Sequence, residues 1–245
     1  MRYKLIIVCL GLFSFTLQAG ELISRGLIEN CDFTPFQFSL GPPVQLFASH
    51  TEVYGIRMSL LGYNSKVWGL DLGLMNFADN LIGLQTGFMN GARRFDGIQM
   101  GFVNFAGGLS ALGEIPFPQN TDTNQRASIG LSGIQIGVMN DAGNMGPMSN
   151  SRKPSQSVET CFSGVQIGIG NFADEICGVQ LGALGNLANE IHGLQISVFC
   201  NYAHVLHGVQ IGLINCADNG ILFDKRESNP GGTYGVGFPI INMAF

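Results

Sequence analysis

Charged residues are scarce in this chain. Asp, Glu, Lys and Arg make up 12% of its 245 residues, against roughly 25% in an average soluble domain. The 12 basic and 17 acidic residues leave a net charge of −5 and form no basic stripe. The sequence therefore predicts no nucleic-acid partner. Beyond the N-terminus, no apolar run reaches the roughly 18–20 residues that a membrane helix needs.

The first residues have the composition of an export signal. Arg2 and Lys4 precede an apolar stretch over residues 5–17, and small residues follow at 19–20. A basic start, an apolar centre and a small-residue cleavage site are typical of a secretory signal peptide. We therefore predict a signal peptide at residues 1–19 and export of one β-repeat domain at residues 20–245.

The exported part would contain an odd number of cysteines. At least one thiol would then be free or intermolecular, and the cysteine spacings match no zinc pattern. We interpret these cysteines as small apolar residues at strand positions. They are Cys31, Cys161, Cys177, Cys200 and Cys216.

One short phrase, Gly-aliphatic-Gln-aliphatic-Gly followed by Asn-x-Ala, recurs along the chain at intervals of mostly 14 or 15 residues. A unit this short cannot bury an apolar face alone, so its stability must come from neighbouring copies. The sequence thus predicts a repeat array rather than an enzyme with a single active site. The copies begin at Gly69, Gly83, Gly97, Gly133, Gly164, Gly178, Gly193 and Gly208.

Each copy alternates with the period of a strand. In the last copy, Val209 and Ile211 point one way while Gln210 and Gly212 point the other. The Asn-x-Ala segment has the chemistry of a turn. Two copies carry one extra residue, which we expect to be absorbed by β-bulges near Gly185 and Cys200. Three interruptions rich in turn residues read as surface loops: 107–128, 143–160 and 218–232.

Two architectures fit this pattern. The first is an antiparallel up-and-down β-barrel of about 12 strands in a membrane. Its aliphatic residues would face lipid, its Gln and Gly residues would face the lumen, and the last strand, ending at Phe245, would pair with the first. The alternative is a β-solenoid, with the aliphatic residues stacked inside and Gln and Asn ladders outside. We predict the barrel.

The repeats resemble a family of exported bacterial surface-repeat proteins, known from spirochaetes and Gram-negative bacteria, with serial G-[LV]-Q-x-G-x-[VI]-N phrases. The likeness covers the repeats together with segments 42–47, 54–61 and 238–242. It implies export and a surface or outer-membrane location, and it brings no catalytic residues. A weaker likeness, to curlin repeats, rests on the Q-x-G-x-x-N-x-A core, as at residues 85–92.

Few residues suggest chemistry. His192, His204, His207 and Glu190 resemble metal ligands in type but lack a fixed ligand frame, so we predict no metal site. Gly168-x-Gly170 opens no helix that would cradle a phosphate. The carboxylates in turns read as caps; they are Asp79, Asp141, Asp174 and Asp218.

Asp71 is the one carboxylate at a Gln position of the repeats, and we expect it to pair with Arg57. Tyr54 and Trp68 would mark an aromatic girdle at a membrane interface.

These observations predict a non-enzymatic exported protein with a structural or interaction role. We predict no catalytic, cofactor-binding or metal-binding residues and no cofactor. The expected location is the outer membrane or cell surface, with outer-membrane lipid as the expected partner. The alternative function is a soluble or surface-attached solenoid acting as an adhesin or assembly module.

Overall fold

The computed structural model describes residues 25–41, 44–107, 131–143, 161–217 and 238–244. The expected signal peptide lies outside these residues, as do the expected loops except for Gly107 and Gly143. All regular structure in the described part is β. The strands are β1 (Phe33–Gly41), β2 (Val44–Gln45), β3 (Glu52–Gly107), β4 (Leu131–Gly143), β5 (Cys161–Ser197), β6 (Cys200–Ala217) and β7 (Phe238–Ala244).

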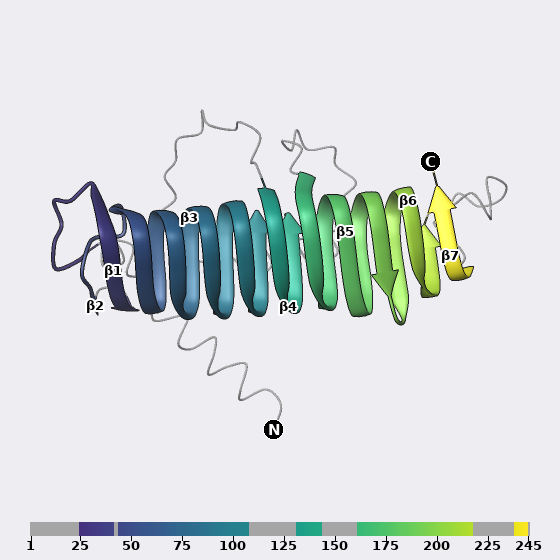
Figure 1. Cartoon of the computed structure of the whole chain (residues 1–245), viewed down its shortest axis with the longest axis horizontal. Helices are drawn as coiled ribbons and strands as arrows, with labels where there is room; N and C mark the ends of the chain where they lie inside the picture. Colours follow the sequence, from purple (N-terminus) through teal and green to yellow (C-terminus); the bar gives the residue numbers. More distant parts are fainter. Residues whose placement is uncertain (1–24, 42–43, 108–130, 144–160, 218–237, 245) are drawn as a thin grey trace, which may run out of the picture.

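The chain winds as a parallel β-solenoid (Figure 1). Parallel pairing between β3 and β4 sets Gly97 beside Gly133, Gln99 beside Gln135 and Asn104 beside Asn140. Each repeat thus lies on the equivalent residues of the preceding one, and β3 alone runs through several turns of the winding. We call one turn of the winding a coil and number its positions from the starting glycine, with the repeat Asn at position 8.

The all-β prediction is confirmed, but the antiparallel barrel is wrong. The sheet order is β2-β1-β3-β4-β5-β6-β7, so the first and last strands lie at opposite ends and never pair. The main pairs are parallel. The physical reason is that the Asn-x-Ala segment turns a corner within the coil and does not reverse the strand direction.

The interior of the solenoid is largely polar. At position 3, each Gln Nε2 donates to the Gln Oε1 of the preceding coil at 2.7–2.9 Å, from Gln99 to Gln210. At position 8, each Asn Nδ2 donates to the Asn Oδ1 of the next coil at 2.8–3.2 Å, from Asn76 to Asn215. These ladders satisfy groups that would be costly to bury unpaired.

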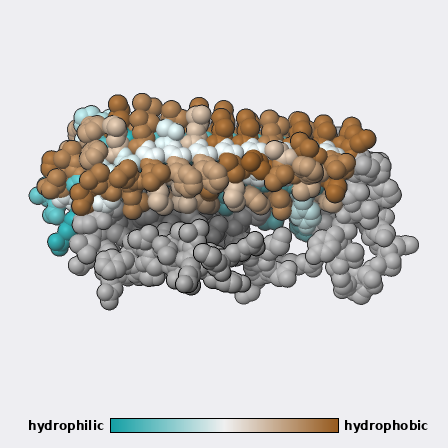
Figure 2. Space-filling view, turned by 90° about the horizontal axis from the view of Figure 1, so that it is seen from below, coloured by the Kyte–Doolittle hydropathy of each residue, from teal (hydrophilic) through white to brown (hydrophobic). Residues whose placement is uncertain are grey.

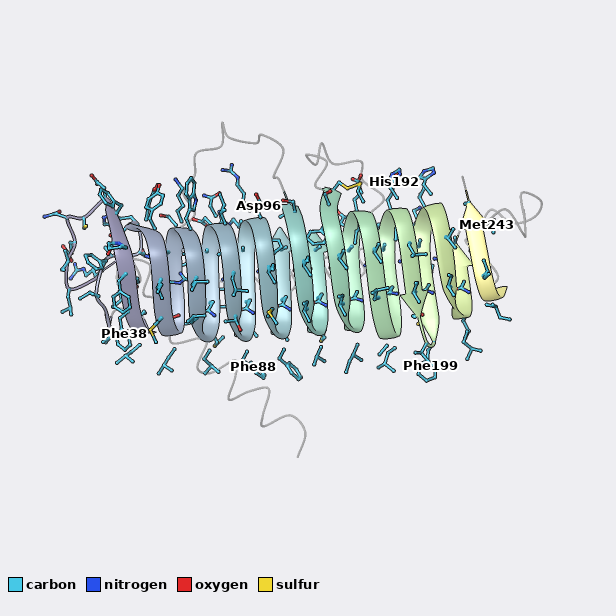
Figure 3. The ribbon with its side chains drawn as sticks, in the orientation of Figure 1. Phe38, Phe88, Asp96, His192, Phe199 and Met243 are labelled. Carbon is cyan, nitrogen blue, oxygen red and sulfur yellow. A yellow bond between two sulfur atoms is a disulfide. The ribbon has the colours of Figure 1, made fainter. Side chains whose placement is uncertain are left out.

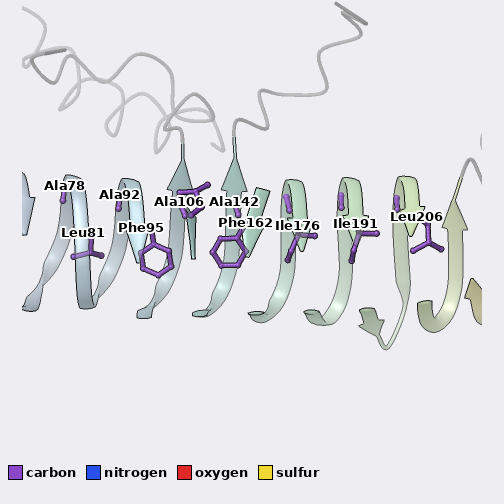
Figure 4. Packing of buried hydrophobic residues seen from close by; sticks show 14 of the residues in the cluster. Ala78, Leu81, Ala92, Phe95, Ala106, Ala142, Phe162, Ile176, Ile191 and Leu206 are labelled. Carbon is purple, nitrogen blue, oxygen red and sulfur yellow. The ribbon is translucent and has the colours of Figure 1, made fainter. Parts of the chain in front are cut away.

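Two apolar rows complete the interior (Figure 4). Position 10 holds alanine, as in Ala92 and Ala142, and position 13 holds a larger apolar residue, as in Phe95 and Ile191. Full burial of one such large side chain contributes about 1.5–3 kcal/mol. Each coil therefore contributes to two apolar rows and two amide ladders.

Glycine at position 1 is required by the stacking. Gly97 has φ +145°, and a Cβ there would overlap the carbonyl oxygen of Gly83. The same contact recurs from coil to coil, for example between Gly133 and Gly97. This close approach of backbones explains why the repeat begins with glycine.

The aliphatic residues at positions 2 and 4 point outward, while Gln and Asn point inward. The solenoid alternative had these faces reversed, and the barrel interpretation had them correct. In the barrel interpretation, the amides point inward because they face a water-filled lumen. In the solenoid they point inward because each amide hydrogen-bonds to the equivalent amide of the next coil. These hydrogen bonds offset the cost of removing the amides from water, so no water-filled lumen is needed.

The C-terminal strand β7 closes the winding. It pairs antiparallel with β6, setting Asn242 beside Gln210, and Asn242 Nδ2 donates to Gln210 Oε1 at 2.9 Å. The Gln ladder thus ends on an amide from β7. Phe245 lies outside the described residues.

Two bulges were expected, near Gly185 and near Cys200. The one near Cys200 coincides with the break between β5 and β6, and Gly185 pairs with Cys200 in the next coil.

Candidate functional site

The outer surface at positions 2, 4, 6 and 7, which we call the apolar edge, is half-buried to exposed and almost purely apolar (Figure 2). Nine coils contribute, because the structure adds a coil at Gly55 that carries Arg57 at the Gln position. Across these coils Thr86 is the one polar side chain, and none is charged. Exposure at positions 6 and 7 is 42–64% for Leu60, Leu74, Phe88, Phe102, Met139, Ile169, Leu184, Val198, Phe199, Leu213 and Ile214.

The apolar edge is long. Parallel strands lie about 4.8 Å apart, so nine coils give a length of about 40 Å. Phe36, Phe38 and Leu40 of β1 extend it and expose 42–51% of their surface. The largest apolar patch on a typical monomer covers roughly 300–600 Å² and is often functional. We therefore take the apolar edge as the first candidate site.

The apolar edge is shaped as a wedge. Asn76 Nδ2 donates to the carbonyl oxygen of Thr86 at 2.9 Å, which ties position 8 of one coil to position 4 of the next. Positions 4 and 8 thus lie close to each other, and the short segment from position 4 to position 8 within a coil makes a tight turn with positions 6 and 7 at its apex. Phe88 and Phe199 protrude there in Figure 3.

The opposite side is mostly polar, although Trp68 and Ile82 are also exposed there. We call the outward residues at positions 11, 12 and 14 the polar edge; Asp96 and His192 lie on it in Figure 3. Strands β3, β4 and β6 all end at this side, at Gly107, Gly143 and Ala217. All three interruptions of the repeat therefore leave the solenoid at one edge, whereas a barrel would have sent consecutive loops to opposite ends.

The turn carboxylates have partners on this side. Asp79 accepts a hydrogen bond from Tyr63 Oη at 2.8 Å and pairs with Arg93 at 3.4 Å. The Asp174 carboxylate accepts from Asn189 Nδ2 at 2.7 Å. Asp218 lies outside the described residues. Burial and the neighbouring Asp79 raise the pKa of Tyr63 above its ordinary value.

Asp141 differs from the other carboxylates. Its strand neighbours in the adjacent coils are Phe105 and Phe172. Within the described part of the chain, no donor reaches its Oδ1. Burial, and secondarily the charge of Asp174, raises the pKa of Asp141 to about 7. The Asp141 carboxyl group thus keeps its proton to a higher pH than an ordinary aspartate does.

We expect Asp141 to make stability depend on pH. The folded state holds this proton more tightly than the unfolded state, whose pKa is near 3.8. The contribution of Asp141 to stability is therefore largest below about pH 4 and is lost as the pH rises to about 7. Asp141→Asn should remove this slope and stabilise the protein by about 2 kcal/mol at pH 8, since a full shift of this size sets a ceiling of about 4 kcal/mol. Urea unfolding followed by circular dichroism measures both.

The control for this experiment is Asp96→Asn, which changes an exposed carboxylate of the polar edge. It should leave the difference between acid and alkaline stability intact. A pH slope that survives in Asp141→Asn would contradict the assignment.

Two cysteines are joined. Cys161 and Cys177 form a disulfide between neighbouring coils of the polar edge. For this pair, the interpretation as merely small apolar residues is wrong. Cys31, Cys200 and Cys216 are outside any disulfide among the described residues.

Next to the disulfide, the structure brings together Glu190, His192 and His207. Glu190 Oε1 lies 2.9 Å from His192 Nε2 and 4.0 Å from His207 Nε2. The two imidazole rings stack at 4.7 Å with an interplanar angle of 16°. His204 is not part of this group. In the sequence, the signal for this pairing was a histidine directly before the starting glycine of two successive coils, at Gly193 and Gly208.

The expected pair of Arg57 and Asp71 is confirmed, in a solenoid core and not in a lumen. Arg57 Nη2 lies 2.6 Å from Asp71 Oδ2, and both side chains are fully buried. Gly168 lies within continuous strand β5, where an added Cβ would overlap the carbonyl oxygen of Gly137 in the preceding coil.

Tyr54 and Trp68 stack edge to face at 5.1 Å, and Lys66 Nζ lies 4.6 Å from the Trp68 ring centre. They form a single cluster near the first coil. The interfacial girdle stays a prediction.

In the described residues, no helix is long and apolar enough to span a bilayer. No protein-family model, curated protein or solved structure matches the chain.

Proposed function

We propose that this protein is a non-enzymatic exported repeat protein that lies on the surface of a lipid bilayer through its apolar edge. The observation that carries the proposal is the absence of charge from every outward position of the apolar edge over nine coils. In water such a surface is costly, so a partner that covers it is strongly favoured.

Lipid fits this surface better than a protein partner. Protein interfaces carry about one hydrogen bond per 100–200 Å² and a polar rim. The apolar edge has only the Thr86 hydroxyl as a polar side chain among its positions. It is also a convex wedge, which a fluid acyl layer covers on both sides of the apex. A rigid partner would need a matching cleft.

The distribution of polar groups suits an interfacial protein. A monotopic structure buries one apolar side about 5–10 Å deep and keeps its polar side in water. Here the polar edge carries the exposed Asp96, His192 and His207. The three interruptions of the repeat also leave from this edge.

Export is supported by two features. The N-terminal sequence has the composition of a secretory signal, and disulfides such as Cys161–Cys177 persist in oxidising compartments. The resemblance to exported surface-repeat proteins points the same way. We place the protein at the cell surface or outer membrane, bound to the lipid face from one side.

Vesicle flotation tests the proposal. The chain should float with neutral phosphatidylcholine vesicles, and binding should persist in high salt because it does not depend on charge. Phe88→Asp should reduce the partition coefficient by about tenfold or more, since burial of one aromatic side chain contributes about 1.5–3 kcal/mol. Phe88 is 52% exposed, so the fold itself should be preserved.

The matched control is Ser163→Asp, which adds the same charge to the exposed polar edge. It should bind vesicles as the unchanged chain does. If the chain fails to float and instead forms dimers that Phe88→Asp dissociates, a second copy covers the apolar edge and the lipid proposal is wrong. A monomer that neither floats nor associates would also overturn it.

A further inference from the structure

The side chains of Glu190, His192 and His207 form a compact group of metal-ligating atoms on the polar edge. The nitrogen and oxygen atoms lie within 4.8 Å of one another. All three residues are partly exposed, with side-chain exposures of 41–45%. A dissolved ion therefore reaches the group without any rearrangement of the coils.

The separations suit a shared ion. Ligand atoms about 2.0–2.1 Å from a tetrahedral zinc ion lie about 3.3 Å apart. The Glu190 to His192 separation of 2.9 Å and the Glu190 to His207 separation of 4.0 Å bracket this value. Rotation of the exposed side chains would bring the three ligand atoms to equal separations.

The backbone holds the two imidazoles in register. His192 pairs with His207 in the parallel ladder of β5 and β6, and the preceding residues, Ile191 and Leu206, are fully buried in the core. With these neighbours fixed inward, both histidines must point outward on the same side. The ring separation of 4.7 Å matches the strand spacing of about 4.8 Å.

The parallel register stacks the two rings, and Glu190 Oε1 lies within 4.0 Å of both Nε2 atoms. The Glu190 carboxylate has a close partner in His192 at 2.9 Å. His207 adds a second imidazole stacked on the first, and two adjacent imidazolium rings would repel each other. A metal ion uses both neutral imidazoles and the carboxylate at once.

We propose that Glu190, His192 and His207 bind a divalent transition-metal ion, with Zn²⁺ the best fit. Two imidazoles and one carboxylate form a ligand set that zinc accepts with water in the fourth position. The site stands on geometry independent of the apolar edge, so it survives if the bilayer proposal fails.

Isothermal titration of the full chain with ZnCl₂ tests the site. Alkylation of the thiols without reductant keeps the Cys161–Cys177 disulfide and removes competing thiolates. We expect about one equivalent to bind. His207→Asn and His192→Asn should each weaken binding by at least the roughly 10–100-fold that loss of an outer-shell partner costs. Glu190→Gln should also weaken it.

His50→Asn is the control, because His50 is exposed and lies in a turn far from this group. It should leave the affinity unchanged. A second measurement needs no variant: Cu²⁺ bound to the unchanged chain should show coupling to two nitrogens by electron paramagnetic resonance. The proposal is overturned by the absence of saturable binding, by full affinity in both His variants, or by copper coupled to fewer nitrogens.

Discussion

Asp71→Leu should destabilise the solenoid by about 3–5 kcal/mol, because it leaves a charged guanidinium unpaired in the core. Arg57 Nε and Nη2 donate to the two Asp71 oxygens at 2.7 and 2.6 Å. The same carboxylate accepts from Gln85 Nε2 at 2.8 Å. Chemical denaturation followed by circular dichroism measures the loss. Arg57→Leu should cost a similar amount, since the carboxylate is then unpaired.

The double variant Arg57→Gln with Asp71→Gln is the matched control. It replaces the ion pair with the amide pair that later coils carry at the same position. Most of the stability should return, because two stacked glutamines satisfy each other as Gln99 and Gln135 do. Arg57 also donates to the carbonyl of Phe77 at 2.9 Å, so a small deficit should remain. A double variant as unstable as the single ones would show that the pair has another role.

The second large effect is expected at Gln135, whose replacement by leucine should cost about 3–5 kcal/mol. Gln135 Nε2 donates to Gln99 Oε1 at 2.9 Å, and its own Oε1 accepts from Gln166 at 2.8 Å. Leucine is similar in volume but leaves both neighbours with an unpaired buried group. Each such group costs about 1–3 kcal/mol. Urea denaturation at neutral pH reports the difference.

Ile136→Gln is the control for this experiment, because the neighbouring residue points outward and is 36% exposed. It should change stability by about 0.5 kcal/mol or less, as surface substitutions do. Equal costs at Gln135 and Ile136 would contradict the placement of amides inside and aliphatic residues outside.

The arrangement of polar pairs was partly predictable. Asp71 stands out because every other copy has Gln at that position, and Arg57 occupies the same position one coil earlier. A carboxylate on a glycine and amide face needs a cation, so the pair follows from the repeat. The parallel solenoid that surrounds the pair could not be predicted from the repeat.

The group of Glu190, His192 and His207 shows the opposite case. Its residues are separated by intervals of 2 and 15 residues that match no helical or zinc-finger spacing. They meet only because the parallel register sets His192 directly beside His207. That register is a property of the stacked coils and of no single segment.

The sequence by itself determined the repeat unit, the strand period of two and the division of each strand into an aliphatic and an amide face. These are local properties, because alternation depends only on the geometry of one extended chain. Only the tertiary structure decided that the strands stack in parallel as coils, with the amides inside. A barrel strand and a solenoid strand share the same alternation. The choice between them depends on contacts between copies: amide ladders such as that of Gln99 and Gln135, and the backbone approach at Gly97 that no other residue permits.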